Sequence, residues 1–150
     1  MSGVGELYQE LILDHNRSPR NYRRMDDATG FAEGRNPLCG DQLTVWLKVD
    51  GDTVVDASFH GSGCAISKSS ASLMTAAVKG RTRGEALRMF EQFQAVVTGT
   101  VPAAAARDDL GKLAVFSGIS AFPVRVKCAT LAWHALKAAL GGPAQAVSTE

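Results

Sequence analysis

Three cysteines and one aspartate are the side chains of this sequence best suited to chemistry. They are the only cysteines among the 150 residues, and the set is Cys39, Asp41, Cys64 and Cys128. Thiolate sulfur and carboxylate oxygen are ligands that Zn²⁺ takes in tetrahedral sites. The residue types therefore predict a structural zinc site, a site for an iron–sulfur cluster, or a masked nucleophile.

Local spacing suits Cys39, Asp41 and Cys64 to one shared site. Cys39 and Asp41 are separated by Gly40, and residues i and i+2 of an extended segment point to the same side. Cys64 follows a Gly-Ser-Gly run at the expected start of a helix, where the helix dipole lowers the pKa of a thiol. A short hairpin between these segments would place them at the same end of a sheet.

The position of Cys128 allows two interpretations. Arg125 and Lys127 flank it, and two cations would favour its thiolate form. Cys128 also lies on an apolar stripe with Leu131, which is typical of a buried core cysteine. Asp41 is similarly ambiguous, because aspartate often caps a turn. Spacing alone leaves these alternatives open.

The histidines argue against a Cys–His hydrolase. His15 lies near the end of the first predicted helix, as a surface residue or a partner of the helix dipole. His134 is six positions after Cys128 and so lies on a different helix face, and strand alternation places His60 with polar residues. No histidine is an obvious general base for a cysteine.

Hydrophobic periodicity predicts an α+β fold, in which helices cover a small three-stranded antiparallel sheet. Asp50-Gly51 is a strong hairpin signal between two alternating strands. The predicted strands are 28–33, 41–49 and 53–60, and the predicted helices are 6–16, 64–79, 85–97, about 108–116 and 123–140.

Composition predicts one domain spanning residues 1–150, with a small, polar and disordered tail from about residue 141. Hydrophobic residues make up 45% of the chain, and the net charge is +1, which gives no general attraction to nucleic acid or to an anionic membrane. The N-terminus does not resemble a signal peptide, and the apolar runs are too short to span a bilayer. We therefore expect a cytoplasmic protein, where reducing conditions favour free or metal-bound thiols.

Three motifs, in order, resemble the IscU/NifU-like family of iron–sulfur assembly proteins. The resemblance covers roughly Leu7 to Leu140 and is closest to the SufU branch. Scaffold members carry histidine directly before the last cysteine, where this chain has Lys127, and they lack the extra segment around residues 83–98. The matching motifs are Asn36-Pro37-Leu38-Cys39-Gly40-Asp41, Gly61-Ser62-Gly63-Cys64-Ala65-Ile66-Ser67 and the segment from Phe122 to Trp133.

The resemblance implies a zinc-dependent sulfurtransferase. Its partner would be a SufS-type, pyridoxal-phosphate-dependent cysteine desulfurase, and a downstream iron–sulfur assembly scaffold would receive the sulfur. Cys39 would accept persulfide sulfur, and Arg125 matches a family arginine associated with docking and ligand exchange. The implied zinc ligands are Cys39, Asp41, Cys64 and Cys128.

Two alternatives remain open from the sequence. The chain could be a scaffold that binds iron or a 2Fe–2S cluster, since cysteine-rich ligation allows it, although Lys127 argues against this. It could also be a binding module with a purely structural zinc, whose removal would unfold the chain.

Overall fold

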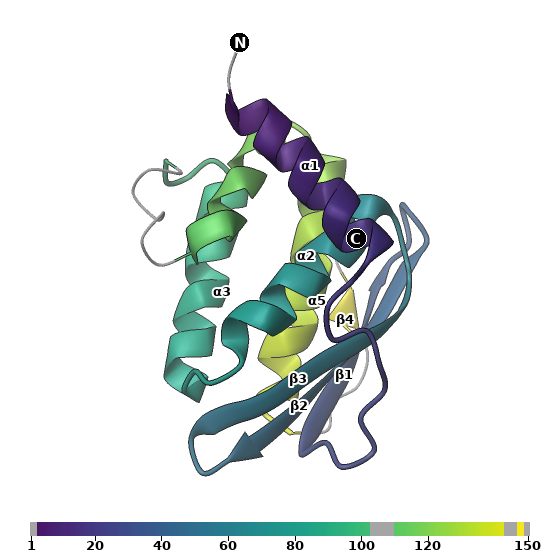
Figure 1. Ribbon diagram of the computed structural model, residues 1–150, viewed down its shortest axis with the longest axis vertical. Helices are drawn as coiled ribbons and strands as arrows, with labels where there is room; N and C mark the ends of the chain where they lie inside the picture. The colour runs from purple at the N-terminus through teal and green to yellow at the C-terminus, as the bar shows by residue number, and fades with distance from the viewer. Residues whose placement is uncertain (1–2, 103–109, 143–146, 149–150) are drawn as a thin grey trace.

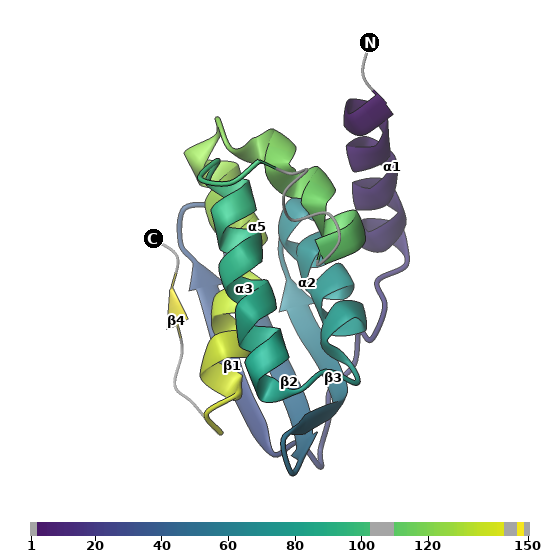
Figure 2. The same cartoon turned by 90° about the vertical axis from the view of Figure 1, so that its left-hand side faces the viewer.

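Four strands form one sheet, and the helices cover one of its two faces (Figures 1 and 2). The computed structural model describes residues 3–102, 110–142 and 147–148. The elements run in the order α1 (Gly3–Arg17), β1 (Gly30–Asn36), β2 (Asp41–Asp50), β3 (Thr53–Ser62), α2 (Ala65–Val78), α3 (Arg83–Val97), the 3₁₀ helix η1 (Gly111–Ile119), α5 (Pro123–Ala139) and β4 (Val147–Ser148).

The sheet has the strand order β3-β2-β1-β4, and its three long strands are antiparallel. Leu43, Val45 and Leu47 of β2 are fully buried on the face that the helices cover, as the alternation predicts. The predicted count of three strands is one short, because Val147–Ser148 pair in parallel with β1. A strand of two residues is too short to show the alternation that predicts a strand from sequence. The rest of the predicted tail beyond Gly142 lies outside the described residues.

Small residues on β1 allow α5 to approach the sheet closely. A side chain added at Gly34 would meet Leu131 of α5 at 3.1 Å, and one added at Gly30 would collide with the Ala139 carbonyl. Helix α5 consequently packs across β1 and β2, while α2 packs against β3 (Figure 2). This packing places the beginning of α5 near the end of β1.

Buried serines on α2 connect that helix to its neighbours. The Ser70 hydroxyl donates to the Ala129 carbonyl of α5 and accepts from the indole N–H of Trp133. Ser72 Oγ lies 2.7 Å from Nδ1 of His15 on α1. His15 is therefore buried against α2, and its predicted place on the surface is wrong.

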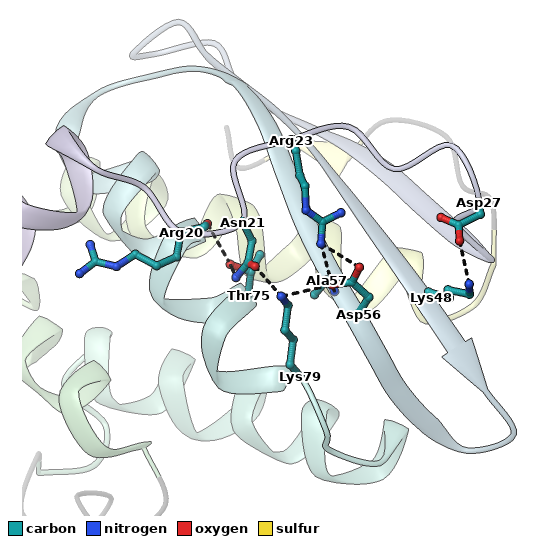
Figure 3. Close-up of polar contacts among 9 residues, drawn as sticks. All are labelled: Arg20, Asn21, Arg23, Asp27, Lys48, Asp56, Ala57, Thr75 and Lys79. Carbon is teal, nitrogen blue, oxygen red and sulfur yellow. Dashed lines mark hydrogen bonds and ion pairs between the residues drawn. The ribbon is translucent and has the colours of Figure 1, made fainter.

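Residues 18–29, which we call the strap, pair with the outer edge of β3 at Asn21 and Arg23 and then continue to Asp27 beside β2 (Figure 3). Backbone hydrogen bonds join Phe59 of β3 to Asn21 and Arg23 of the strap. Asp56 of β3 accepts from Arg23 and forms an ion pair with Lys79. The strap thus covers an edge strand that would otherwise expose unpaired backbone groups.

The strap also contacts the end of β3 that leads to Cys64, because the Tyr22 hydroxyl donates to the Gly61 carbonyl at 2.5 Å. A second ion pair, Lys48–Asp27, holds the far end of the strap to β2 (Figure 3).

The helix predicted from about Asp108 to Phe116 differs from the structure. Asp108 and Asp109 lie outside the described residues, and η1 is a 3₁₀ helix that continues to Ile119. Among the described helices, none has a long enough apolar stretch to cross a membrane.

Candidate metal centre

Asn36 and Asp41 close the β1–β2 hairpin and face the helices. The two residues are partners in the strand ladder, and both are buried. They are the last inward-facing residue of β1 and the first of β2. Because strand side chains alternate, the pattern that buries Leu43 also buries Asp41 at the sheet end.

Cys39 lies on the exposed turn between these strands. Its backbone N–H and that of Gly40 both donate to the Asn36 carbonyl, at 3.2 and 2.9 Å. Gly40 has a φ of 72°, which glycine adopts without the strain of a side chain. Cys39 is therefore in a tight turn, and the expected extended i, i+2 relationship with Asp41 is wrong. It is the exposed cysteine of the three.

Cys64 is the N-cap residue of α2. Its sulfur accepts from the Ser67 backbone N–H at 3.5 Å, and its own N–H donates to Asp41 Oδ1 at 2.8 Å. A side chain at Gly63 would lie 3.0 Å from Asp41 Oδ1, so the absence of a Cβ leaves room for that carboxylate. The sequence prediction of a cysteine at a helix start is confirmed.

Cys128 lies in the second turn of α5 and is 3% exposed. Its Sγ is 3.3 Å from Cys39 Sγ, so a buried and an exposed thiol meet across two elements. The side-chain amide of Asn36 donates to Cys128 Sγ at 3.4 Å. Cys128 is thus both a buried cysteine and a member of the cluster.

Three of the four sequence-predicted ligands form one group among the described residues, Cys64 lies beside that group, and all four offer donor atoms that suit zinc. One sulfur each from Cys39 and Cys128 and one oxygen of Asp41 all lie within 4.8 Å of one another. Cys64 Sγ lies 4.0 Å from Asp41 Oδ2. A tetrahedral zinc with Zn–S bonds of about 2.3 Å needs sulfur atoms about 3.8 Å apart, and the Cys39 and Cys128 sulfurs are 3.3 Å apart. The donor set therefore fits a tetrahedral ion.

The thiols differ in acidity. A hydrogen bond from the Cys128 thiol, together with donors from Ser67, lowers the pKa of Cys64 to about 6, against opposing effects of burial and Asp41. Hydrogen bonding to Cys64, burial and hydrogen bonding to Cys39 raise the pKa of Cys128. The flanking cations were predicted to favour the Cys128 thiolate. Without a bound metal the pKa of Cys128 is raised instead, so this prediction is wrong.

Arg125 does not join the cluster. Its guanidinium lies over the Phe122 ring, 4.5 Å from the centroid, and its side chain is exposed. Lys127 is half-buried. Both cations therefore belong to the start of α5 and its surface.

Among the described residues, no histidine belongs to the group of possible metal ligands. The His60 ring packs on Tyr22, and the His134 ring packs on Phe90.

Two residues that contact the cluster had no assigned role in the sequence analysis. Asn36 bridges Asp41 and Cys128, and Ser67 donates to Cys64. Asn36 could have been found from the hairpin register, which pairs it with Asp41. Ser67 could have been found as the third residue of the helix that Cys64 caps.

Comparison with known proteins identifies the family. Residues 7–129 match the NifU-like N-terminal domain, and the chain belongs to this family. Its fold matches the crystal structure of FiSufU from Fervidobacterium islandicum AW-1, with a TM-score of 0.83, 34% identity and coverage of 92% of this chain and 99% of that one.

The named relatives fall into two classes. The zinc-dependent sulfurtransferase SufU of Bacillus subtilis is 43% identical over 136 residues, which cover 91% of this chain and 90% of that protein. The iron–sulfur cluster assembly scaffold protein IscU of Streptococcus pyogenes is 37% identical over 146 residues, which cover 97% and 90%. The scaffold protein IscU of Thermotoga maritima is 41% identical over 137 residues, which cover 89% and 92%. The relatives therefore support iron–sulfur cluster assembly and divide on the particular role.

Proposed function

We propose that this chain is a zinc-dependent sulfurtransferase that accepts sulfur from the persulfide of a pyridoxal-phosphate-dependent cysteine desulfurase. The observation that carries the proposal is the contrast between the thiols. Cys39 is exposed on a turn, whereas Cys128 beside it is 3% exposed and fixed in a helix. Only an exposed thiol can meet a sulfur donor that is held on another protein.

The residues that would hold zinc are Cys39, Asp41, Cys64 and Cys128. Bound zinc would keep the thiols deprotonated and would protect them from oxidation. Three free thiols also suit a reducing compartment such as the cytoplasm.

The transfer step is an exchange between thiols. The Cys39 thiolate attacks the outer sulfur of the partner's cysteine persulfide. The partner's sulfur–sulfur bond breaks, its cysteine leaves as a thiolate, and a persulfide forms on Cys39. No electrons enter or leave, so the step needs no oxidant or reductant. A downstream assembly scaffold would then take the sulfur from Cys39.

The surface around Cys39 favours a protein as sulfur donor. Leu38 is 62% exposed beside Cys39, and Phe122 and Val124 are about half exposed at the start of α5. The exposed guanidinium of Arg125 lies on Phe122. This apolar rim, with the exposed Arg125 cation on it, suits a partner that presents apolar side chains and a carboxylate around its persulfide.

The test is to incubate the chain with the desulfurase and cysteine and to map adducts by mass spectrometry. We expect the mass of one additional sulfur atom on the peptide that contains Cys39, and its loss in Cys39→Ser. A sulfur adduct confined to Cys64 or Cys128, or an adduct-free chain, would overturn the proposal. Desulfurase turnover with and without the chain measures the accompanying stimulation.

The names of the Streptococcus and Thermotoga relatives favour a second candidate, a scaffold for iron–sulfur cluster assembly. Cysteine-rich ligation is compatible with it. Anaerobic reconstitution separates the two functions. A stable and transferable cluster, formed in preference to zinc binding, would favour the scaffold.

A further inference from the structure

Asn36 contacts the candidate metal centre through both its side chain and its main chain. It is fully buried at the end of β1. Its side-chain Nδ2 lies 3.4 Å from Asp41 Oδ2 and 3.4 Å from Cys128 Sγ. One amide group thus donates to an oxygen on β2 and to a sulfur on α5, which are two of the four proposed ligands.

The main chain of Asn36 acts on a third ligand. Its carbonyl accepts from the N–H groups of Cys39 and Gly40, which fixes the turn that carries Cys39. Asn36 therefore sets the position of Asp41 and Cys128 through its side chain and of the Cys39 turn through its backbone. Cys64 is held separately, through Ser67 and the N–H bond to Asp41.

The orientation of the Asn36 amide leaves its oxygen unsatisfied. Oδ1 is buried and has no hydrogen-bond partner among the described residues. The reverse orientation would point this oxygen at a carboxylate and a sulfur, which are themselves acceptors. A buried acceptor without a partner opposes folding, so packing and stability alone do not account for an asparagine here.

We propose that Asn36 is a positioning residue, which holds Asp41 and Cys128 in place as metal ligands. The inference rests on the proposed zinc site. Hydrogen bonds to metal ligands orient them and raise affinity, and their loss typically costs about 10–100-fold. Because Asn36 ties the two buried ligands to each other, they keep their arrangement when the exposed Cys39 moves.

The test compares Asn36→Ala with Thr130→Val as a matched control. Thr130 is also buried, two residues beyond Cys128 on α5, but its hydroxyl bonds the Val126 carbonyl of its own helix. Zinc affinity is measured by competition with a chromophoric chelator, and the stability of the zinc-free proteins by thermal unfolding.

We expect Asn36→Ala to weaken zinc binding about 10–100-fold. The zinc-free midpoint should fall no more than in Thr130→Val, because the unpaired oxygen leaves together with the donor. Thr130→Val should bind zinc within about twofold of wild type. With Co²⁺ as probe, the sulfur-to-cobalt charge-transfer bands should weaken in Asn36→Ala alone.

Three results would overturn the inference: Asn36→Ala with wild-type zinc affinity, an equal loss of affinity in Thr130→Val, or wild-type protein that binds no zinc. A wild-type chain that binds zinc but gains no sulfur on Cys39 would instead refute the proposed function and leave the role of Asn36 intact.

Discussion

Cys39 Sγ and Cys128 Sγ lie 3.3 Å apart, although 89 residues separate them in the chain. Cys39 lies on the turn between β1 and β2, whereas Cys128 lies in the packed helix α5.

Replacing the two thiols should affect stability unequally. Cys128→Ser puts a hydroxyl in a buried position, and we expect the free energy of unfolding of the zinc-free protein to fall by about 1–3 kcal/mol. Cys39→Ser changes an exposed side chain and should cost less than about 0.5 kcal/mol. Urea unfolding with a chelator present measures both values. Equal losses would contradict the difference in burial.

Gly63→Ala should disturb Asp41. The new methyl group would lie 3.0 Å from Asp41 Oδ1 and would also collide with the Ser67 hydroxyl. We expect weaker zinc binding and a loss of about 1–3 kcal/mol in stability. Gly84→Ala, in the first turn of α3, has open space around it and should stabilise the chain by up to about 1 kcal/mol. Wild-type zinc affinity in Gly63→Ala would be evidence against the close approach.

Acid should destabilise the fold through His15. Burial and the nearby Arg20 lower the pKa of His15 below its ordinary value of 6.5. The unfolded chain therefore binds a proton more readily, so this contribution to stability is complete above pH 6.5 and is lost as pH falls below it. Chemical unfolding between pH 5 and 8, roughly the range over which histidines titrate, should show a shallower acid loss in His15→Gln than in wild type. An acid loss in His15→Gln as steep as that of wild type would contradict this role of His15.

Reversing the charge of Arg125 should weaken association with the desulfurase. Arg125 is exposed at the start of α5, so Arg125→Glu would place a negative charge on the proposed docking rim. We expect the chain concentration for half-maximal stimulation of the desulfurase to rise about tenfold, with a salt dependence, and turnover at saturation to stay unchanged. Arg88→Glu on α3 makes the same charge change elsewhere. Equal effects in both variants would indicate a general charge effect instead of docking by Arg125.

Alternation and turn residues made much of the fold predictable. Leu43, Val45 and Leu47 define the inner face of β2, and Asp50-Gly51 marks the hairpin that returns as β3. The same alternation includes Asp41 and buries it at the end of the sheet, whereas the full set of four ligands came from the family resemblance. Strand β4 was missed, because its pairing with Gly34 and Arg35 is a tertiary contact with no local pattern.

The supporting contacts of the candidate site were harder to predict. The amide of Asn36 reaches Cys128 across 92 residues, and that contact depends on how closely α5 packs on β1. The burial of His15 depends on Ser72 of another helix. Residue spacing in the sequence reveals neither the Asn36–Cys128 contact nor the His15–Ser72 contact, because both arise from packing between elements. The lowered pKa of Cys64 agrees in direction with the expectation from its place at a helix start, whereas the raised pKa of Cys128 does not follow from its charged neighbours in the sequence, because Cys64 and Cys128 act on each other in space.

The wide separation of Cys39 and Cys128 in the chain has a thermodynamic consequence. An ion held by both residues would act as a removable crosslink that closes a loop of 89 residues. On the chain-entropy model a permanent link of that span is worth roughly 4–5 kcal/mol. A partner that displaces Cys39 alone would leave this long loop closed through Asp41 and Cys128, and would free only the β1–β2 turn. Sulfur transfer and local loosening of the β1–β2 turn would then be a single event.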